Sequence, residues 1–230
     1  FVAQEEMHRF SGFWFSPDSK RIAFQHTSHH GMERFTIADP LHPEVEGAHF
    51  PYPRPGQKNA EVTVLVADIS KPKQPLAVKW NAGDWPYLAT VKWQKGGPLT
   101  LVVQNREQTR EQILTVDTVS GETMPIHTEE DAAWLKLHQE FPRWVDDGSG
   151  FLWLSERAGT PDIELRKRDG SLEKVLAKNA NGFAGASAAM ETYLDATRAL
   201  YFYSGADSTQ GGLFRSVDGA AAEAVKSPVG

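Results

Sequence analysis

The sequence predicts an all-β fold, a β-propeller fragment of about four four-stranded antiparallel blades, and two observations support this. First, an aromatic strand that ends at a turn and leads directly into a second apolar strand occurs four times, around Phe15, Trp93, Trp144 and Tyr193. Second, the last three of these residues follow one another at intervals of about 50 residues, close to the roughly 40–50 residues of a propeller blade. The whole chain, residues 1–230, is therefore expected to form one partial propeller domain.

The first blade is expected over residues 11–83. Its first strand covers the aromatic residues 13–15, and its second begins at 21–24 after the turn Ser16-Pro17-Asp18. The third strand is expected in two parts, residues 33–38 and 61–68, on either side of an insertion. This insertion accounts for the greater length of the first blade.

The insertion covers residues 42–60 and contains prolines at the alternate positions 51, 53 and 55. Such spacing favours an extended, polyproline-like path and disfavours strand pairing. Two interpretations remain open: a rigid connector between two strands of the blade, or an arm that packs on another subunit or domain.

The other three blades are expected over residues 84–140, 141–183 and 184–230. Each continues after its first strand pair with two further strands, which are joined at turns that contain Ser120-Gly121, Asp169-Gly170 and Asp218-Gly219. Asp-Gly is a strong hairpin signal, and alternating polar and apolar residues in these strands indicate sheets with one buried face.

Helical signal is sparse. Residues 129–135 could form one short helix, because acidic residues favour a first helical turn. Residues 1–10 are expected to hold a second short helix, at residues 4–10, that carries the acidic pair Glu5-Glu6.

Composition excludes several classes of function. The net charge of −6 leaves no basic footprint for nucleic acid, and no run approaches the about 18 apolar residues of a membrane span. The chain has no cysteine, which excludes disulfides, thiolate nucleophiles and cysteine-bound zinc. Because it does not begin with Met, we expect a piece or a processed form of a longer protein.

Catalytic and metal-binding motifs are missing. The nucleophile elbow Gly-x-Ser-x-Gly does not occur, and Ser149 is expected in a turn between two glycines. His26, His29 and His30 cluster without a metalloprotease motif, so we expect a solvated loop and no metal site. Phosphate-binding and dinucleotide-binding glycine patterns are absent as well, so no cofactor is expected.

Glu5 and Glu6 are the candidate binding residues. An ammonium group has three donors, and two carboxylates that accept from it form charge-assisted hydrogen bonds. Taken alone, the pair could equally be the solvated start of a helix.

The neighbours of this pair resemble a known family. Three stretches carry the likeness: Glu5-Glu6 ahead of Phe13-Trp14-Phe15-Ser16-Pro17-Asp18, the run Pro51-Tyr52-Pro53-Arg54-Pro55-Gly56 ahead of Val62-Thr63-Val64, and Trp144-Val145-Asp146-Asp147-Gly148 ahead of Ser155-Glu156-Arg157. Together they are similar to the N-terminal propeller domain of the dipeptidyl peptidase IV branch of the prolyl oligopeptidase family of serine peptidases. Ala60 departs from the pattern, because proline is common there.

The resemblance implies a fold and a function. In that family an eight-bladed propeller caps an α/β-hydrolase domain, and Glu5 and Glu6 would bind the free N-terminal amine of a peptide whose X-Pro or X-Ala dipeptide is released. The chain itself would hold no catalytic residue and would be inactive without the hydrolase domain and the remaining blades. The resemblance also implies a homodimeric parent enzyme in the bacterial periplasm or secreted from the cell.

Two readings from other classes remain open. One is a non-enzymatic propeller-type binding module, which would need no acidic pair. The other is a structural or interaction fragment in which the glutamates only begin a helix.

Overall fold

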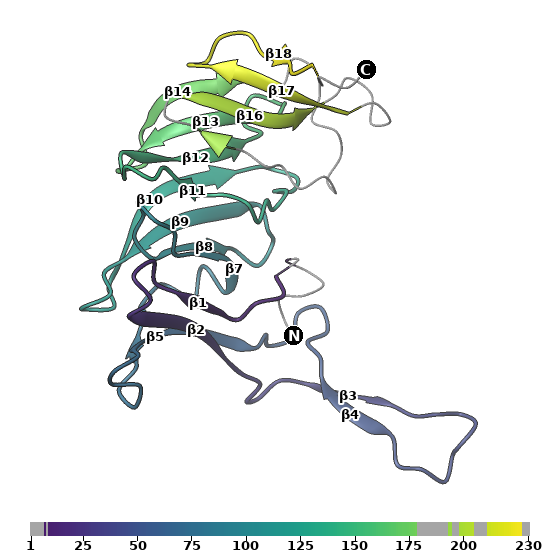
Figure 1. Ribbon diagram of the computed structural model, residues 1–230. Coiled ribbons are helices and arrows are strands. Elements are labelled where there is room, and N and C mark those ends of the chain that lie inside the picture. Colours follow the sequence, from purple (N-terminus) through teal and green to yellow (C-terminus); the bar gives the residue numbers. More distant parts are fainter. Residues whose placement is uncertain (1–6, 8, 179–192, 195–197, 205–210, 227–230) are drawn as a thin grey trace.

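The computed structural model describes residues 7, 9–178, 193–194, 198–204 and 211–226. These residues form four four-stranded antiparallel sheets and a separate two-stranded hairpin, so the all-β prediction is confirmed. Each four-stranded sheet is one blade, and the four are stacked in chain order (Figure 1).

The first sheet has the strand order β1 (Phe13–Phe15), β2 (Arg21–Ser28), β5 (Glu61–Asp68) and β6 (Leu76–Ala77). A side-chain-stabilised turn joins its first two strands. The Ser16 hydroxyl donates to Asp18 Oδ1 at 2.6 Å and accepts the backbone N–H of Arg21 at 2.9 Å. Ser and Asp are common in turns because their short side chains bond to nearby backbone groups in this way.

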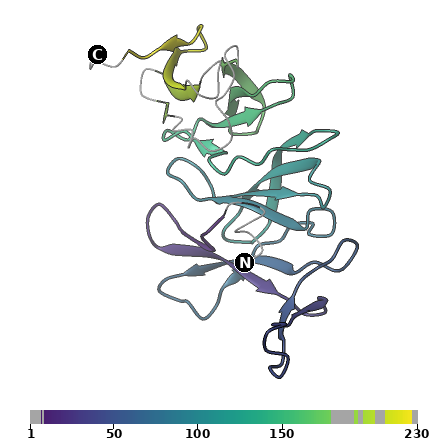
Figure 2. The ribbon, with the colours of Figure 1, turned by 90° about the vertical axis from the view of Figure 1, so that its right-hand side faces the viewer.

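The prediction of a third strand split around the insertion is wrong. All eight residues of β2 pair with β5, from Arg21 opposite Asp68 to Ser28 opposite Glu61, so residues 33–38 have no place between them. Instead, β3 (Arg34–Ile37) pairs with β4 (Ala48–Pro51) in a hairpin. We call residues 33–52 the arm; it projects away from the sheets in both ribbon views (Figures 1 and 2).

Pro51 does not prevent this pairing, because it lies at a tolerated position in the hairpin. Pro51 is the last residue of β4 and lies opposite Arg34, at the free edge of a two-stranded ribbon. A proline is tolerated at an edge, where its missing N–H would face solvent.

The other three sheets follow the chain without interruption, each strand pairing with the next. The second consists of β7 (Tyr87–Lys92), β8 (Thr100–Gln104), β9 (Arg110–Val116) and β10 (Thr123–Glu130). The third consists of β11 (Arg143–Trp144), β12 (Gly150–Ser155), β13 (Asp162–Lys167) and β14 (Leu172–Ala177). The fourth consists of β15 (Tyr193–Leu194), β16 (Ala199–Ser204), β17 (Gly212–Val217) and β18 (Glu223–Ala224).

The predicted helix at residues 129–135 is wrong too. Strand β10 continues through Glu130, because Glu129 and Glu130 pair with Glu111 and Arg110 of β9, and residues 131–137 are irregular. Pairing across the sheet overrides the weak local preference for a helix. The predicted helix at residues 4–10 lies mostly outside the described residues. Within the part of the chain that the structure describes, no helix is long and apolar enough to cross a membrane.

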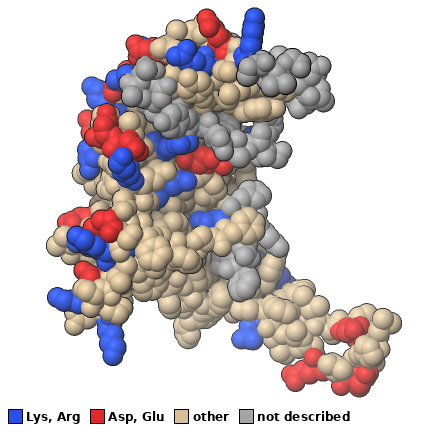
Figure 3. All heavy atoms as spheres, in the orientation of Figure 1, with Lys and Arg blue, Asp and Glu red and all other residues tan. Residues whose placement is uncertain are grey.

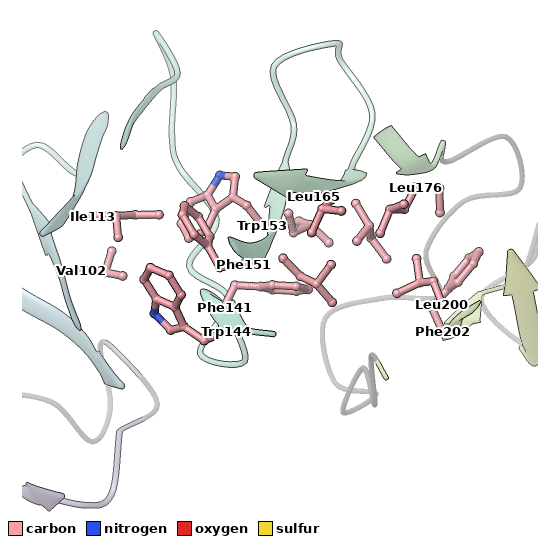
Figure 4. Close-up of a cluster of buried hydrophobic side chains, with 14 of the residues drawn as sticks. Val102, Ile113, Phe141, Trp144, Phe151, Trp153, Leu165, Leu176, Leu200 and Phe202 are labelled. Atoms are coloured by element: carbon pink, nitrogen blue, oxygen red, sulfur yellow. The ribbon is translucent and has the colours of Figure 1, made fainter. Parts of the chain in front are cut away.

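Apolar side chains fill the space between successive sheets. One cluster lies between the first and second sheets and includes Val64, Val66 and Leu101. A larger one runs from the second sheet through the third to the fourth, from Val102 and Ile113 to Leu200 and Phe202 (Figure 4). Each inner sheet therefore buries both of its faces, one against each neighbour, so the prediction of a single buried face is wrong for these sheets.

Trp144 is central to the larger cluster. Its ring lies 5.1 Å from that of Phe151 between centroids, and its indole N–H donates to the hydroxyl of Thr100 at 2.9 Å. The ring packs directly over Gly97, where the β-carbon of any other residue would lie 2.2 Å from a ring atom. The glycine is thus required by packing between the second and third sheets.

We predict that Gly97→Ala lowers the free energy of unfolding by about 1–3 kcal/mol, because the added methyl group pushes against the buried indole. Urea unfolding monitored by tryptophan fluorescence measures the effect. Gly12→Ala is the matched control, since its β-carbon would meet nothing within 4 Å. Equal stability of the two variants would contradict the prediction.

Candidate functional site

Glu5 and Glu6 lie outside the described residues. Of the residues that follow them, the structure describes Met7 and the chain from Arg9 onward. Met7 is bonded to Glu6 and is only 3% exposed. It belongs to the same hydrophobic cluster as Ala89 of β7 and Phe141. The residue next to the acidic pair is therefore anchored in the core.

Arg9 anchors the same segment between the first two sheets. Its guanidinium donates to Gln25 Oε1 of β2 at 2.5 Å and to the carbonyl oxygen of Leu88 of β7 at 3.2 Å. The guanidinium carbon also lies 5.4 Å from the centroid of the Trp14 ring, a cation–π arrangement. Burial lowers the pKa of Arg9 to about 10, which leaves the side chain charged at neutral pH.

A second polar cluster joins the second and third sheets around Glu129, which is 4% exposed. Its carboxylate accepts hydrogen bonds from Ser155 Oγ at 2.7 Å, Arg157 Nη2 at 2.6 Å and His127 Nε2 at 2.9 Å. Burial alone would raise the pKa of Glu129, but these hydrogen bonds lower it to about 2. The ionised carboxylate thus ties β10 to the neighbouring sheet.

Glu111 lies directly opposite Glu129 in the pairing of β9 with β10, and it is also 4% exposed. Two carboxylates at such positions repel each other if both are ionised. Burial raises the pKa of Glu111 to about 7, and the charge of Glu129 acts in the same direction. On its other side, Glu111 accepts a hydrogen bond from Gln104 Nε2 of β8 at 3.1 Å.

Sequence reasoning missed this cluster. The sequence predicts Glu129 in a helix, and Ser155 and Arg157 enter only through the family resemblance. The alternation of β9 could have placed Glu111 on a buried face, but no sequence signal shows that Glu129 lies opposite it. That juxtaposition depends on the register of two strands.

The other sequence candidates do not converge. His29 and His30 are exposed after β2, but His26 lies in β2 opposite Thr63, so the expectation of a loop is wrong for it. Among the described residues there is no group of three or more His, Asp or Glu side chains that could hold a metal ion. Ser149 lies in the turn before β12, where its backbone N–H donates to Asp147 Oδ1 at 2.8 Å.

The chain matches the model of a known protein family. The family model described as dipeptidyl peptidase IV (DPP IV) N-terminal region matches residues 1–218. The chain therefore belongs to this family, and its stacked four-stranded sheets are blades of the propeller of that region.

The relatives bear dipeptidyl peptidase names. Inactive dipeptidyl peptidase 10 of Mus musculus is 23% identical over 222 residues, which cover 90% of this chain and 27% of that protein. Venom dipeptidyl peptidase 4 of Apis mellifera is 26% identical over 136 residues, which cover 54% of this chain and 17% of that protein. The chain thus spans less than a third of the length of these relatives.

Two solved structures share the fold. Porphyromonas gingivalis dipeptidyl peptidase 4 superposes with a TM-score of 0.72 at 18% identity, over 97% of this chain and 31% of that one. A putative dipeptidyl aminopeptidase IV from Bacteroides ovatus gives a TM-score of 0.74 at 16% identity, over 89% of this chain and 31% of that one.

The buried carboxyl pair generates a pH prediction. Glu111 binds a proton more tightly in the folded state, where its pKa is about 7, than in the unfolded state, where its pKa is near the ordinary value of 4.5. Its contribution to stability is therefore fully present below a pH of about 4.5 and is lost as the pH rises through about 7. Burial lowers the pKa of His127, and that of His138 to about 4, so these groups act in the opposite direction.

We therefore compare wild type with Glu111→Gln, because the histidines are common to both proteins. Relative to the variant, wild type should lose on the order of 2–3 kcal/mol of unfolding free energy between pH 5 and pH 8. Urea unfolding across this range measures the difference. Glu130→Gln, an exposed neighbour on β10, should show no such trend, and parallel curves for wild type and Glu111→Gln would contradict the prediction.

Proposed function

We propose that this chain is the substrate-gating and amine-binding part of a dipeptidyl aminopeptidase, a serine exopeptidase that releases N-terminal X-Pro or X-Ala dipeptides. The family match and the names of the relatives support the class of enzyme. The amine-binding role is supported by the anchoring of Met7 and Arg9 in the fold, directly after Glu5-Glu6. Catalysis itself is assigned to an α/β-hydrolase domain elsewhere in the full-length protein.

The proposed recognition of the peptide N-terminus depends on opposite charges. A peptide with a free N-terminus carries an ammonium group, and two carboxylates can accept its hydrogen bonds and balance its charge. An internal peptide bond offers no such group, so the site selects the end of a chain. If the amine is fixed, the length of two residues determines which peptide bond reaches the catalytic serine.

Exposed apolar surface supports the proposal that further blades precede this one. Phe13 and Phe15 of β1 are 55% and 51% exposed, and their rings are 6.1 Å apart. They lie on the face of the first sheet that is turned away from the second sheet, because their neighbour Trp14 packs on the inner cluster. An apolar sheet face of this kind is expected to be covered by another sheet.

We further propose a bacterial periplasmic or secreted location, without nucleic-acid or membrane partners. The solved structures that share the fold come from Porphyromonas and Bacteroides. The absence of cysteine and the net charge of −6 are compatible with this location.

In the full-length protein, Glu5→Gln or Glu6→Gln should lower kcat/KM for an X-Pro chromogenic substrate by roughly 10- to 1000-fold. Each change removes charge-assisted hydrogen bonds to the substrate amine. Glu223→Gln, at an exposed position of β18 away from the arm, is the matched control and should retain wild-type activity. Full activity of both acidic-pair variants would refute the amine-binding role.

The mouse relative is named an inactive dipeptidyl peptidase, which supports a second candidate, a non-enzymatic propeller-type binding module. In that case wild-type protein would release no dipeptide. Calorimetric titration with a free dipeptide would then report whether Glu5 and Glu6 still bind an amine.

We also propose that the full-length protein is a homodimer and that the arm contributes to the contact. The arm displays large apolar side chains that are about half exposed or more, namely Phe35, Ile37, Leu41, Val45, Phe50 and Tyr52. Acidic side chains gather at its free end, Asp39, Glu44 and Glu46 (Figure 3). At its base, an ion pair between Arg54 and Glu33 holds the two strands together.

Replacing residues 35–50 by a short Gly-Ser linker should convert the full-length protein from dimer to monomer, because the apolar contact is removed while β2 and β5 keep their pairing. Size-exclusion chromatography with light scattering measures the mass. Met124→Gln, an exposed apolar residue away from the arm, serves as the control. An unchanged dimer, or a monomeric wild type, would contradict the proposal.

A further inference from the structure

Strand β7, an edge strand of the second sheet, contains a bulge beside the anchored segment. In the pairing of β7 with β8, Leu88 lies opposite Val103 and Thr90 opposite Val102, so Ala89 is an extra residue without a partner in the register. Bulges of this kind redirect backbone groups and are frequent next to functional sites. The carbonyl groups of Leu88 and Ala89 both accept side-chain hydrogen bonds here.

Gln139 uses the bulge to hold the chain that follows the acidic pair. Its Nε2 donates to the carbonyl oxygen of Ala89 at 2.8 Å and to that of Met7 at 2.6 Å. The hydroxyl of Thr90, which is 1% exposed, donates to Gln139 Oε1 at 3.1 Å. The hydroxyl therefore fixes which end of the amide faces the two carbonyl groups, and the Met7 carbonyl is joined to β7 through one side chain.

Arg9 supplies a second connection to the same bulge. Its guanidinium donates to the carbonyl oxygen of Leu88, one residue before Ala89. Residues 7 and 9 are thus attached to two consecutive carbonyl groups of β7, once through Gln139 and once directly. The chain that follows the acidic pair is thus held to the second sheet at Met7, the residue bonded to Glu6, and again at Arg9.

We infer that Gln139 is a positioning residue for the amine-binding carboxylates, a role that rests on the proposed function. It acts through the backbone of Met7, with Thr90 as the group that orients its amide. Loss of the Gln139 amide frees the Met7 carbonyl from β7 and lets the adjacent carboxylate leave the position in which it meets the substrate amine. Positional errors of about 1 Å are sufficient for 10- to 100-fold losses.

The test uses the full-length protein with Gln139→Leu, which keeps the apolar part of the side chain and removes the amide. Gln112→Leu is the matched control, since Gln112 donates its hydrogen bond to Thr128 on the surface of the same sheet. Thr90→Val is a second variant in case Gln139→Leu does not fold, because it keeps the shape of a buried side chain and removes only the orienting hydroxyl.

Two readouts are measured. The first is the inhibition constant of the dipeptide Ala-Pro, which carries a free amine, alongside the rate of inactivation by a fluorophosphonate, which reacts with a catalytic serine and needs no amine. The second is the amide hydrogen exchange of a peptide that covers residues 2–10. In Gln139→Leu, and to a smaller extent in Thr90→Val, we expect a weakening of Ala-Pro inhibition of about ten-fold or more. We also expect an unchanged fluorophosphonate rate and faster exchange of the peptide.

The outcomes separate the two proposals. If wild type is inhibited by Ala-Pro and Glu5→Gln abolishes that inhibition, while Gln139→Leu behaves like Gln112→Leu, the positioning role is wrong and the proposed function stands. If wild type neither reacts nor binds Ala-Pro, the proposed function is wrong. Equal exchange of residues 2–10 in Gln139→Leu and Gln112→Leu overturns the positioning role whatever the activity. If Gln139→Leu lowers the rate of inactivation by the fluorophosphonate as strongly as it weakens Ala-Pro inhibition, Gln139 has a general structural role instead.

Discussion

The fold depends on the burial of the sheet faces that lie between neighbouring sheets. Some of its strands are only two residues long, such as β11, and their own hydrogen bonds cannot hold them. Trp144 of β11 is also held by the second sheet: its indole N–H donates to the hydroxyl of Thr100, and its backbone N–H donates to Gln94 Oε1 at 3.0 Å. Contacts between neighbouring sheets therefore add to the short pairing within the third sheet.

Buried polar side chains also bridge neighbouring sheets. Between the second and third sheets, Glu129 accepts hydrogen bonds from Ser155 and Arg157 of the neighbouring blade. Between the first and second, Arg9 bonds to Gln25 on one side and to Leu88 on the other. Buried charges are tolerated here because each has several partners. Arg9, which follows the acidic pair in the chain, is thus held at the junction of two blades.

Where local signals are strong, the sequence is sufficient. Gly170 ends the turn between β13 and β14 with a positive φ of 87°, at the place where Asp169-Gly170 predicts a hairpin. Where the structure of a segment depends on which strand it pairs with, the prediction from sequence is wrong. The strand pattern of residues 33–38 predicts part of a blade, and only the complete pairing of β2 with β5 excludes them. The acidic start of residues 129–135 favours a helix locally, although β9 holds Glu129 and Glu130 in a strand.

By itself, the sequence determined the all-β class, the repeat of about 50 residues and the membership in the dipeptidyl peptidase IV family, because periodicity, turn residues and motifs are local properties of the chain. Only the tertiary structure decided that Glu111 and Glu129 lie opposite each other and that Gln139 reaches Met7. Both contacts depend on how separate elements meet: a shift of one residue between β9 and β10 would move Glu129 away from Glu111.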